Sequence, residues 1–317
     1  MRGGLNLPTG HSKQVYNHLD ECVRSYCGLI FNPFAALEWV EGRATIESAS
    51  AIAAVVDSVK LKYITEADYL VYTREVLDQC HEYDPTIKVP DFPVLQKLSD
   101  NITLSSAVGI LATQVPDYLE DSQRKRFQKN GQIPTEVPVF SVRQWVEETF
   151  KWKDKNPETY QERIDGFKTS LSEDIERRDE YFADPRQYRK GWMKGFLKID
   201  RILKAFNPGI DVDTVLDSID ATQCPAVSLY WKVREKRMLS GNPPKDNDVD
   251  DYGFIPVVLY ADIVLIESNL REFILQADKS LESKVFSSAS DALCCLNKCV
   301  FTYEGNLYGQ TSSQEIH

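Results

Sequence analysis

The stretch NDVDDYGFIPVVLYADIVLIESN, residues 247–269, holds the most apolar run of the chain, yet acidic residues lie at both of its ends. A further acid, Asp262, lies inside it. An interior segment normally excludes carboxylates, because an unpaired charge in a low-dielectric medium costs much free energy. The pattern therefore leaves two interpretations. Either the acids cover the ends of a core helix and strand, or they are held together around a metal ion.

The pattern predicts a helix over residues 247–260, followed by an apolar strand over residues 261–267. Asp248 and Asp251 lie three residues apart, on one side of the first helical turn. Glu267 falls at the carboxyl end of the strand, the edge where α/β sheets place their sites. For Asp248 a helix cap is the plain alternative, since an N-cap Asp stabilises a helix by about 1 kcal/mol.

Composition limits the class of protein. The chain has 317 residues, 42% hydrophobic and 27% charged, which is typical of a globular protein with a sizeable core. No apolar run is long enough for a membrane span, and the N-terminus lacks the apolar segment of a signal peptide. Seven cysteines without a regular framework favour a reducing, cytoplasmic location. The net charge of −11 argues against a surface that coats nucleic acid generally, although a local basic face remains open.

Outward from this stretch the chain divides into three parts. Residues 1–98 alternate strand-like segments, such as GLIFNP and KLKYIT, with helical ones, and residues 222–305 return to this α/β character. Between them, residues 99–221 read as helix after helix. We therefore predict an α/β core built from both ends of the chain, a helical insert over residues 99–221, and a C-terminal tail over residues 306–317.

The last long helix of the insert, predicted over residues 185–206, carries a basic stripe. Its four cations follow a spacing of four, four and three, opposite an apolar stripe of Trp192, Phe196, Ile199 and Leu203. A solvated face over a packed one explains this pattern, and so does a ridge that binds RNA phosphates. Two further arginines precede the acidic stretch. The candidate phosphate contacts are Lys190, Lys194, Lys198, Arg201, Arg234 and Arg237.

The acidic stretch resembles the distal half of PIN-like nuclease domains. In that family N-D-x-x-D opens a helix, and Tyr-x-Asp, an apolar strand and a terminal acid follow. Segment 28–40 also resembles the family's second strand and following helix, where an inward acid is expected. The resemblance implies a short parallel sheet flanked by helices. The matching residues are Glu38, Asn247, Asp248, Asp251, Tyr260, Asp262 and Glu267.

The resemblance implies metal-dependent cleavage of RNA. Mg²⁺ and Mn²⁺ prefer oxygen ligands, and such an ion polarises the scissile phosphate and activates a water. Glu38, Asp248 and Glu267 are then the catalytic ligands, and Asp251 is a further ligand. Asn247 and Asp262 support them.

One position departs from the family. PIN-like domains carry an Asp on their first strand, but no Asp precedes Asp20 here, and Asn6 is the nearest polar match. A missing carboxylate weakens a metal site. Two hypotheses follow: a metal-dependent ribonuclease, or a non-catalytic PIN-like protein that binds another, for example inhibitory, protein. The sequence lacks the phosphate-binding loops and serine-hydrolase motifs of other enzyme classes.

Overall fold

The computed structural model describes most of the chain between residues 29 and 295. The described ranges are 29–31, 61–97, 103–128, 132–138, 141–245, 248–288, 290–292 and 294–295. Three predicted site residues, Glu38, Asn6 and Asn247, lie outside them.

Helices dominate the described residues, and the strands are short. The α-helices are α4 (Asp68–Tyr83), α5 (Ala107–Gln114), α6 (Asp121–Phe127), α7 (Val142–Lys155), α8 (Pro157–Glu176), α9 (Arg178–Ala183), α10 (Pro185–Gly195), α11 (Ile199–Phe206), α12 (Val212–Ser218), α13 (Pro225–Ser240), α14 (Asp248–Asp251), α15 (Val257–Tyr260) and α16 (Ser268–Ala277). The 3₁₀ helices are η1 (Ala221–Gln223), η2 (Tyr252–Phe254) and η3 (Lys279–Ser283). The strands are β1 (Leu29–Phe31), β2 (Leu61–Thr65), β3 (Leu95–Lys97), β4 (Thr103–Ser105), β5 (Glu136–Pro138), β6 (Val264–Leu265) and β7 (Val285–Phe286).

Parallel pairing occurs twice among the residues that the structure describes, as expected of an α/β protein. β1 pairs with β2 in parallel, with Phe31 opposite Ile64, and β3 adds to β2 antiparallel. β6 pairs with β7 in parallel, and α16 connects them, which makes a short β–α–β unit. β4 and β5 form a separate antiparallel pair. The predicted mixed α/β class is thus confirmed, whereas the PIN-like arrangement itself stays a prediction.

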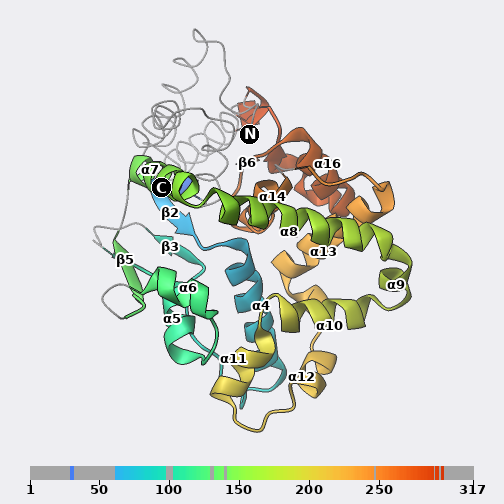
Figure 1. Cartoon of the computed structure of the whole chain (residues 1–317). Coiled ribbons are helices and arrows are strands. Elements are labelled where there is room, and N and C mark those ends of the chain that lie inside the picture. The colour runs from blue at the N-terminus through green and yellow to red at the C-terminus, as the bar shows by residue number, and fades with distance from the viewer. Residues whose placement is uncertain are drawn as a thin grey trace, which may run out of the picture.

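Helix α13 packs against α4, α8 and α16, and Figure 1 shows it in the right half of the molecule beside α4. Pro225 suits its first position, and the Glu75 carboxylate of α4 accepts the N–H groups of Ala226 (2.8 Å) and Val227 (3.1 Å). Gly241 ends the helix in the left-handed region, at φ +64°, where glycine is favoured. A side chain distant in sequence therefore caps α13.

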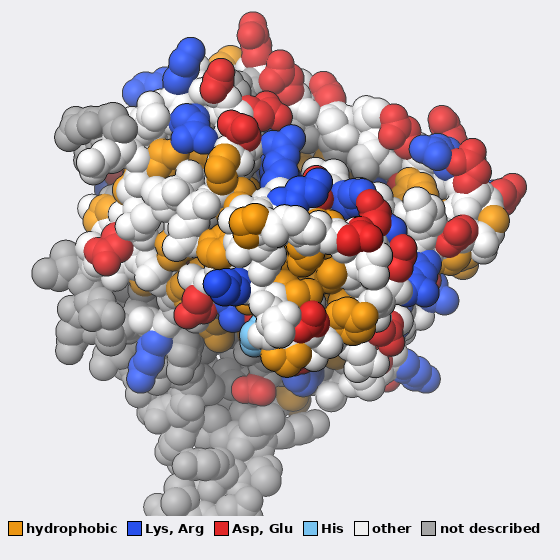
Figure 2. Space-filling model, turned by 90° about the horizontal axis from the view of Figure 1, so that it is seen from below, with side chains coloured by type: hydrophobic (Ala, Val, Ile, Leu, Met, Phe, Trp, Pro, Cys, Tyr) orange, Lys and Arg blue, Asp and Glu red, His pale blue; other side chains and the backbone are white. Residues whose placement is uncertain are grey.

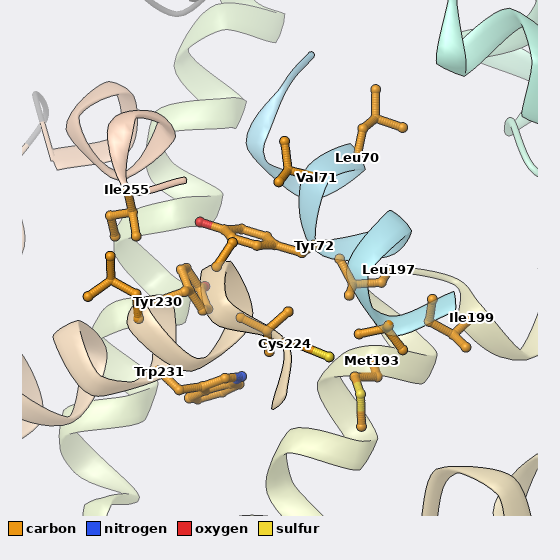
Figure 3. Close-up of a cluster of buried hydrophobic side chains, with 14 of the residues drawn as sticks. Leu70, Val71, Tyr72, Met193, Leu197, Ile199, Cys224, Tyr230, Trp231 and Ile255 are labelled. Atoms are coloured by element: carbon orange, nitrogen blue, oxygen red, sulfur yellow. The ribbon is translucent and has the colours of Figure 1, made fainter. Parts of the chain in front are cut away.

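The core around α13 combines aromatic and aliphatic side chains from distant segments (Figure 3). Tyr72 of α4 packs on Tyr230, with ring centroids 5.0 Å apart, and Trp231 lies beside them. Leu197 and Ile199, from the α10–α11 region, belong to the same buried cluster. The predicted insert thus shares one core with the segments around it, and its boundaries stay a prediction.

The predicted continuous helix over residues 185–206 is wrong, because α10 ends at Gly195 and α11 begins at Ile199. Lys198 adopts the left-handed region, at φ 56°. Leu197 and Ile199 are 1% and 0% exposed, and residues two apart on one helix point in nearly opposite directions. The break allows both to enter the core.

Candidate functional site

Asp248 lies in the interior, on the first turn of α14, and is 2% exposed. Its carboxylate forms an ion pair with the guanidinium of Arg237, and the side chains of both residues are 3% exposed. The same carboxylate accepts the backbone N–H of Lys245 at 2.5 Å. Arg237 also donates to the carbonyl oxygen of Pro243 (3.3 Å) and lies over the ring of Phe273. The pair therefore fastens α14 and the loop before it to α13.

The other predicted acids are distributed around this pair. Asp251, on the same helical turn, is 4% exposed. Glu267 is half-buried at the N-cap position of α16, two residues beyond β6. Asp262 is exposed in a bend before β6, so the prediction that it lies within an apolar strand is wrong. Its segment leaves the core before the strand begins, and an exposed carboxylate needs no partner.

A metal cluster is not assembled within the described ranges. No group of three or more His, Cys, Asp or Glu side chains is placed there to hold an ion. Because Glu38 and Asn6 lie outside these ranges, the predicted Mg²⁺ or Mn²⁺ site of Glu38, Asp248, Asp251 and Glu267 stays a prediction.

Arg234, predicted to contact nucleic acid, is buried one turn before Arg237. It is 4% exposed and forms an ion pair with Asp174 of α8, which also accepts the hydroxyl of Tyr188 at 2.7 Å. Its guanidinium further donates to Ser170 Oγ (3.1 Å). Both guanidiniums are held by buried carboxylates in this arrangement, and their contact with phosphates stays a prediction. Both arginines connect α13 to its neighbours.

The predicted basic stripe is divided between two uses. Lys190 is 7% exposed and bridges Asp213 (2.9 Å) and Asp217 (2.8 Å) of α12, and Lys194 also pairs with Asp213 (3.1 Å). Lys190 was expected on the solvated face, but the break after Gly195 lets α12 pack over it.

Beyond the break, the cations of the stripe bind backbone oxygens. Lys198 donates to the carbonyl of Tyr118 (2.7 Å), and Arg201 donates to that of Asp117 (2.8 Å). α10 and α11 also lie in the lower half of the molecule, away from α14 in the upper half (Figure 1). A single ridge that leads phosphates toward Asp248 is therefore not formed.

Two acids that the sequence analysis did not single out follow β2 directly. Burial raises the pKa of Glu66 to about 7 and that of half-buried Asp68 to about 6. Glu66 accepts the Ala107 N–H (3.4 Å) and lies within 3.5 Å of the Gln96 amide nitrogen. The signal was present in the sequence, since acids immediately after a predicted strand occupy the edge favoured for sites.

A cleft of about 510 Å³ opens between α8, α10 and α13. Asp174 and Arg234 contribute to its wall, together with Tyr188, Trp192 and Trp231. Its two buried charges, Asp174 and Arg234, form the ion pair described above.

Comparison with known proteins gives no relative: no family model, no curated protein and no solved structure matches this chain. In the part of the chain that the structure describes, no helix has the length and apolar character needed to cross a membrane. Function is therefore argued from the geometry alone.

Proposed function

We propose that this chain is a non-catalytic, PIN-like protein that acts as a protein-interaction module. The observation that carries the proposal is the position of Asp248, the acid that best fits the predicted metal site. Its carboxylate is occupied by the buried guanidinium of Arg237 and by the Lys245 N–H. A divalent cation there would meet a fixed positive charge, and withdrawal of Arg237 would leave that charge unpaired in the interior at a cost of several kcal/mol.

The remaining charges support the same reading. Four of the six predicted phosphate contacts are held in ion pairs with acids of the same chain, namely Lys190, Lys194, Arg234 and Arg237. Internal pairing removes most of the charge that RNA would need, because affinity for nucleic acid depends on cations that remain available to phosphates. The acids and bases of this protein mainly stabilise its own helices.

Calorimetric titration with MnCl₂ tests the proposal. The wild type and an Asp248→Asn variant should give the same heat, equal to that of dilution. The variant must be shown to be folded, because loss of the Arg237 partner destabilises it. Specific Mn²⁺ binding by the wild type that disappears in folded Asp248→Asn would overturn the proposal.

The metal-dependent ribonuclease is the second candidate, and one observation favours it. Asp248 and Asp251 are both buried on one turn, shortly before the β6–α16–β7 unit, and Glu267 follows β6. This order of elements agrees with the one that the PIN-like resemblance implies. In that case Mg²⁺ or Mn²⁺ would replace Arg237 as the partner of Asp248. The Mn²⁺ titration separates the two candidates, with Glu267→Gln as a second variant outside the ion pair.

A further inference from the structure

A stack of three aromatic rings leads from the core to the surface at the end of α10. Tyr230, 4% exposed, stacks on Trp192 with ring centroids 5.2 Å apart and an interplanar angle of 22°. Trp192 stacks in turn on Phe196, at 5.7 Å and 21°. Phe196 is 54% exposed, and the ring of Tyr69 meets it edge-on at 6.4 Å. The outermost ring is thus held rigidly from below while much of its surface contacts water.

Two cations follow this ring in the chain, Lys198 and Arg201. Within the described ranges neither forms an ion pair with a carboxylate, and each donates to a backbone carbonyl instead. Burial lowers the pKa of Lys198 and the charge of Arg201 lowers it further, against a smaller opposite effect of the Glu120 carboxylate. A negative group beside them would relieve this repulsion. Their neighbours Lys190 and Lys194, by contrast, are paired with acids of α12.

We propose that Phe196, Lys198 and Arg201 form a docking surface for a short acidic segment of a partner protein that carries an aromatic side chain. The inference rests on the proposed interaction function and names the chemistry of the partner. An exposed aromatic ring supported by a stacked ring, with an arginine five residues further along the chain, has the composition of an interface hot spot. The partner's aromatic ring packs on Phe196, and its carboxylates approach the two cations. Carbonyl oxygens already hold both cations in place, so little side-chain freedom is lost on binding.

A protein segment fits this surface better than RNA. A nucleic acid presents a phosphate at every nucleotide and is bound by many cations, whereas only these two remain unpaired on the former stripe. Figure 2 looks at the molecule from the side of α11 and α12, where hydrophobic side chains lie among basic and acidic ones rather than in a uniformly basic field.

The test uses the full chain and a fluorescein-labelled hexapeptide of sequence Gly-Glu-Glu-Phe-Glu-Glu, with binding followed by fluorescence anisotropy. One control peptide has Ser in place of Phe, and another has Lys in place of Glu. A labelled single-stranded oligouridine is the RNA probe. Phe196→Ser and Arg201→Met change the surface. Phe182→Ser, at a 42% exposed ring on α9, and Lys232→Met, at an exposed lysine on α13, are the matched controls.

We expect the wild type to bind the acidic Phe peptide. The affinity of Phe196→Ser for this peptide should be at least ~10-fold lower, as for substitutions at interface hot spots. Arg201→Met should weaken it less, and the matched controls should leave it unchanged. Both control peptides should bind more weakly to the wild type. The inference would be overturned if the wild type did not bind the acidic Phe peptide, or if Phe196→Ser bound it equally well. It would also be overturned if the wild type bound the Lys peptide or oligouridine more tightly than the acidic Phe peptide. Failure here differs from failure of the proposed function, which would show as Mn²⁺ binding that depends on Asp248.

Discussion

Replacement of Asp248 by Asn should destabilise the protein by about 3–5 kcal/mol, the range for breaking a buried ion pair. Both partners are 3% exposed, so water cannot solvate the guanidinium of Arg237 that remains. The amide of Asn keeps an oxygen for the Lys245 N–H, and the loss therefore reports mainly on the charge. Arg237→Met should cost a similar amount, because it leaves the carboxylate buried with a single hydrogen bond.

The double variant Asp248→Leu with Arg237→Met is the informative comparison. Replacing a buried pair by apolar groups is often neutral or stabilising, so this variant should be clearly more stable than either single variant. Urea unfolding at neutral pH, followed by the fluorescence of core tryptophans such as Trp231, gives the free energies of unfolding. Asp262→Asn, at an exposed acid, should change them by less than about 0.5 kcal/mol. A cost below about 1 kcal/mol for Asp248→Asn, or a double variant no more stable than the single ones, would refute the reasoning.

Three further predictions concern the same core. Glu75→Ala removes the carboxylate that caps α13. Urea unfolding should show a free energy of unfolding lower by about 1.5–3 kcal/mol, the range for hydrogen bonds to a charged group, and an unchanged value would contradict the cap. Burial raises the pKa of Glu66 from 4.5 to about 7, so its contribution to stability falls as pH rises between these values. The stability of Glu66→Gln relative to the wild type should therefore increase as the pH rises from 5 to 8 (roughly the span over which this carboxyl titrates). A stability difference that does not change with pH would contradict this cause. A Cβ at Gly109 would lie 1.9 Å from the carbonyl oxygen of Pro134. Gly109→Ala should therefore lower the free energy of unfolding by about 1–3 kcal/mol or more, whereas Gly166→Ala, whose Cβ meets open space, should raise it by up to about 1 kcal/mol. Equal effects of the two substitutions in thermal or urea unfolding would contradict the clash.

Local signals in the sequence were sufficient for much of the secondary structure. The segment KLKYIT contains β2, GLIFNP contains β1, and Pro225 begins α13 as its fixed φ favours. These features depend on residues within a few positions of each other. The break between α10 and α11 was not predicted, because it depends on the core neighbours of Leu197 and Ile199. Periodicity within one helix does not reveal those neighbours.

The candidate site was predicted less well, for a related reason. Asp248 was placed correctly on the first turn of a helix, but its partner Arg237 lies eleven residues earlier and was given a separate role in RNA binding. Arg234 and Asp174 are sixty residues apart and pair in the same way. Tertiary packing chooses such partners, and a charge in a sequence pattern shows only that a partner is needed. Phe196 likewise lay on the predicted apolar face, yet the break after Gly195 exposes it.

The central claim is that the acids of the C-terminal stretch stabilise the fold rather than hold a catalytic metal. It is tested most directly by incubating the wild-type protein with an end-labelled single-stranded RNA in MnCl₂ and separating the products on a denaturing gel. The claim predicts that the RNA stays intact at all times of incubation. Mn²⁺-dependent cleavage by the wild type, lost in a folded Glu267→Gln variant and retained in the exposed-acid control Asp262→Asn, would contradict it.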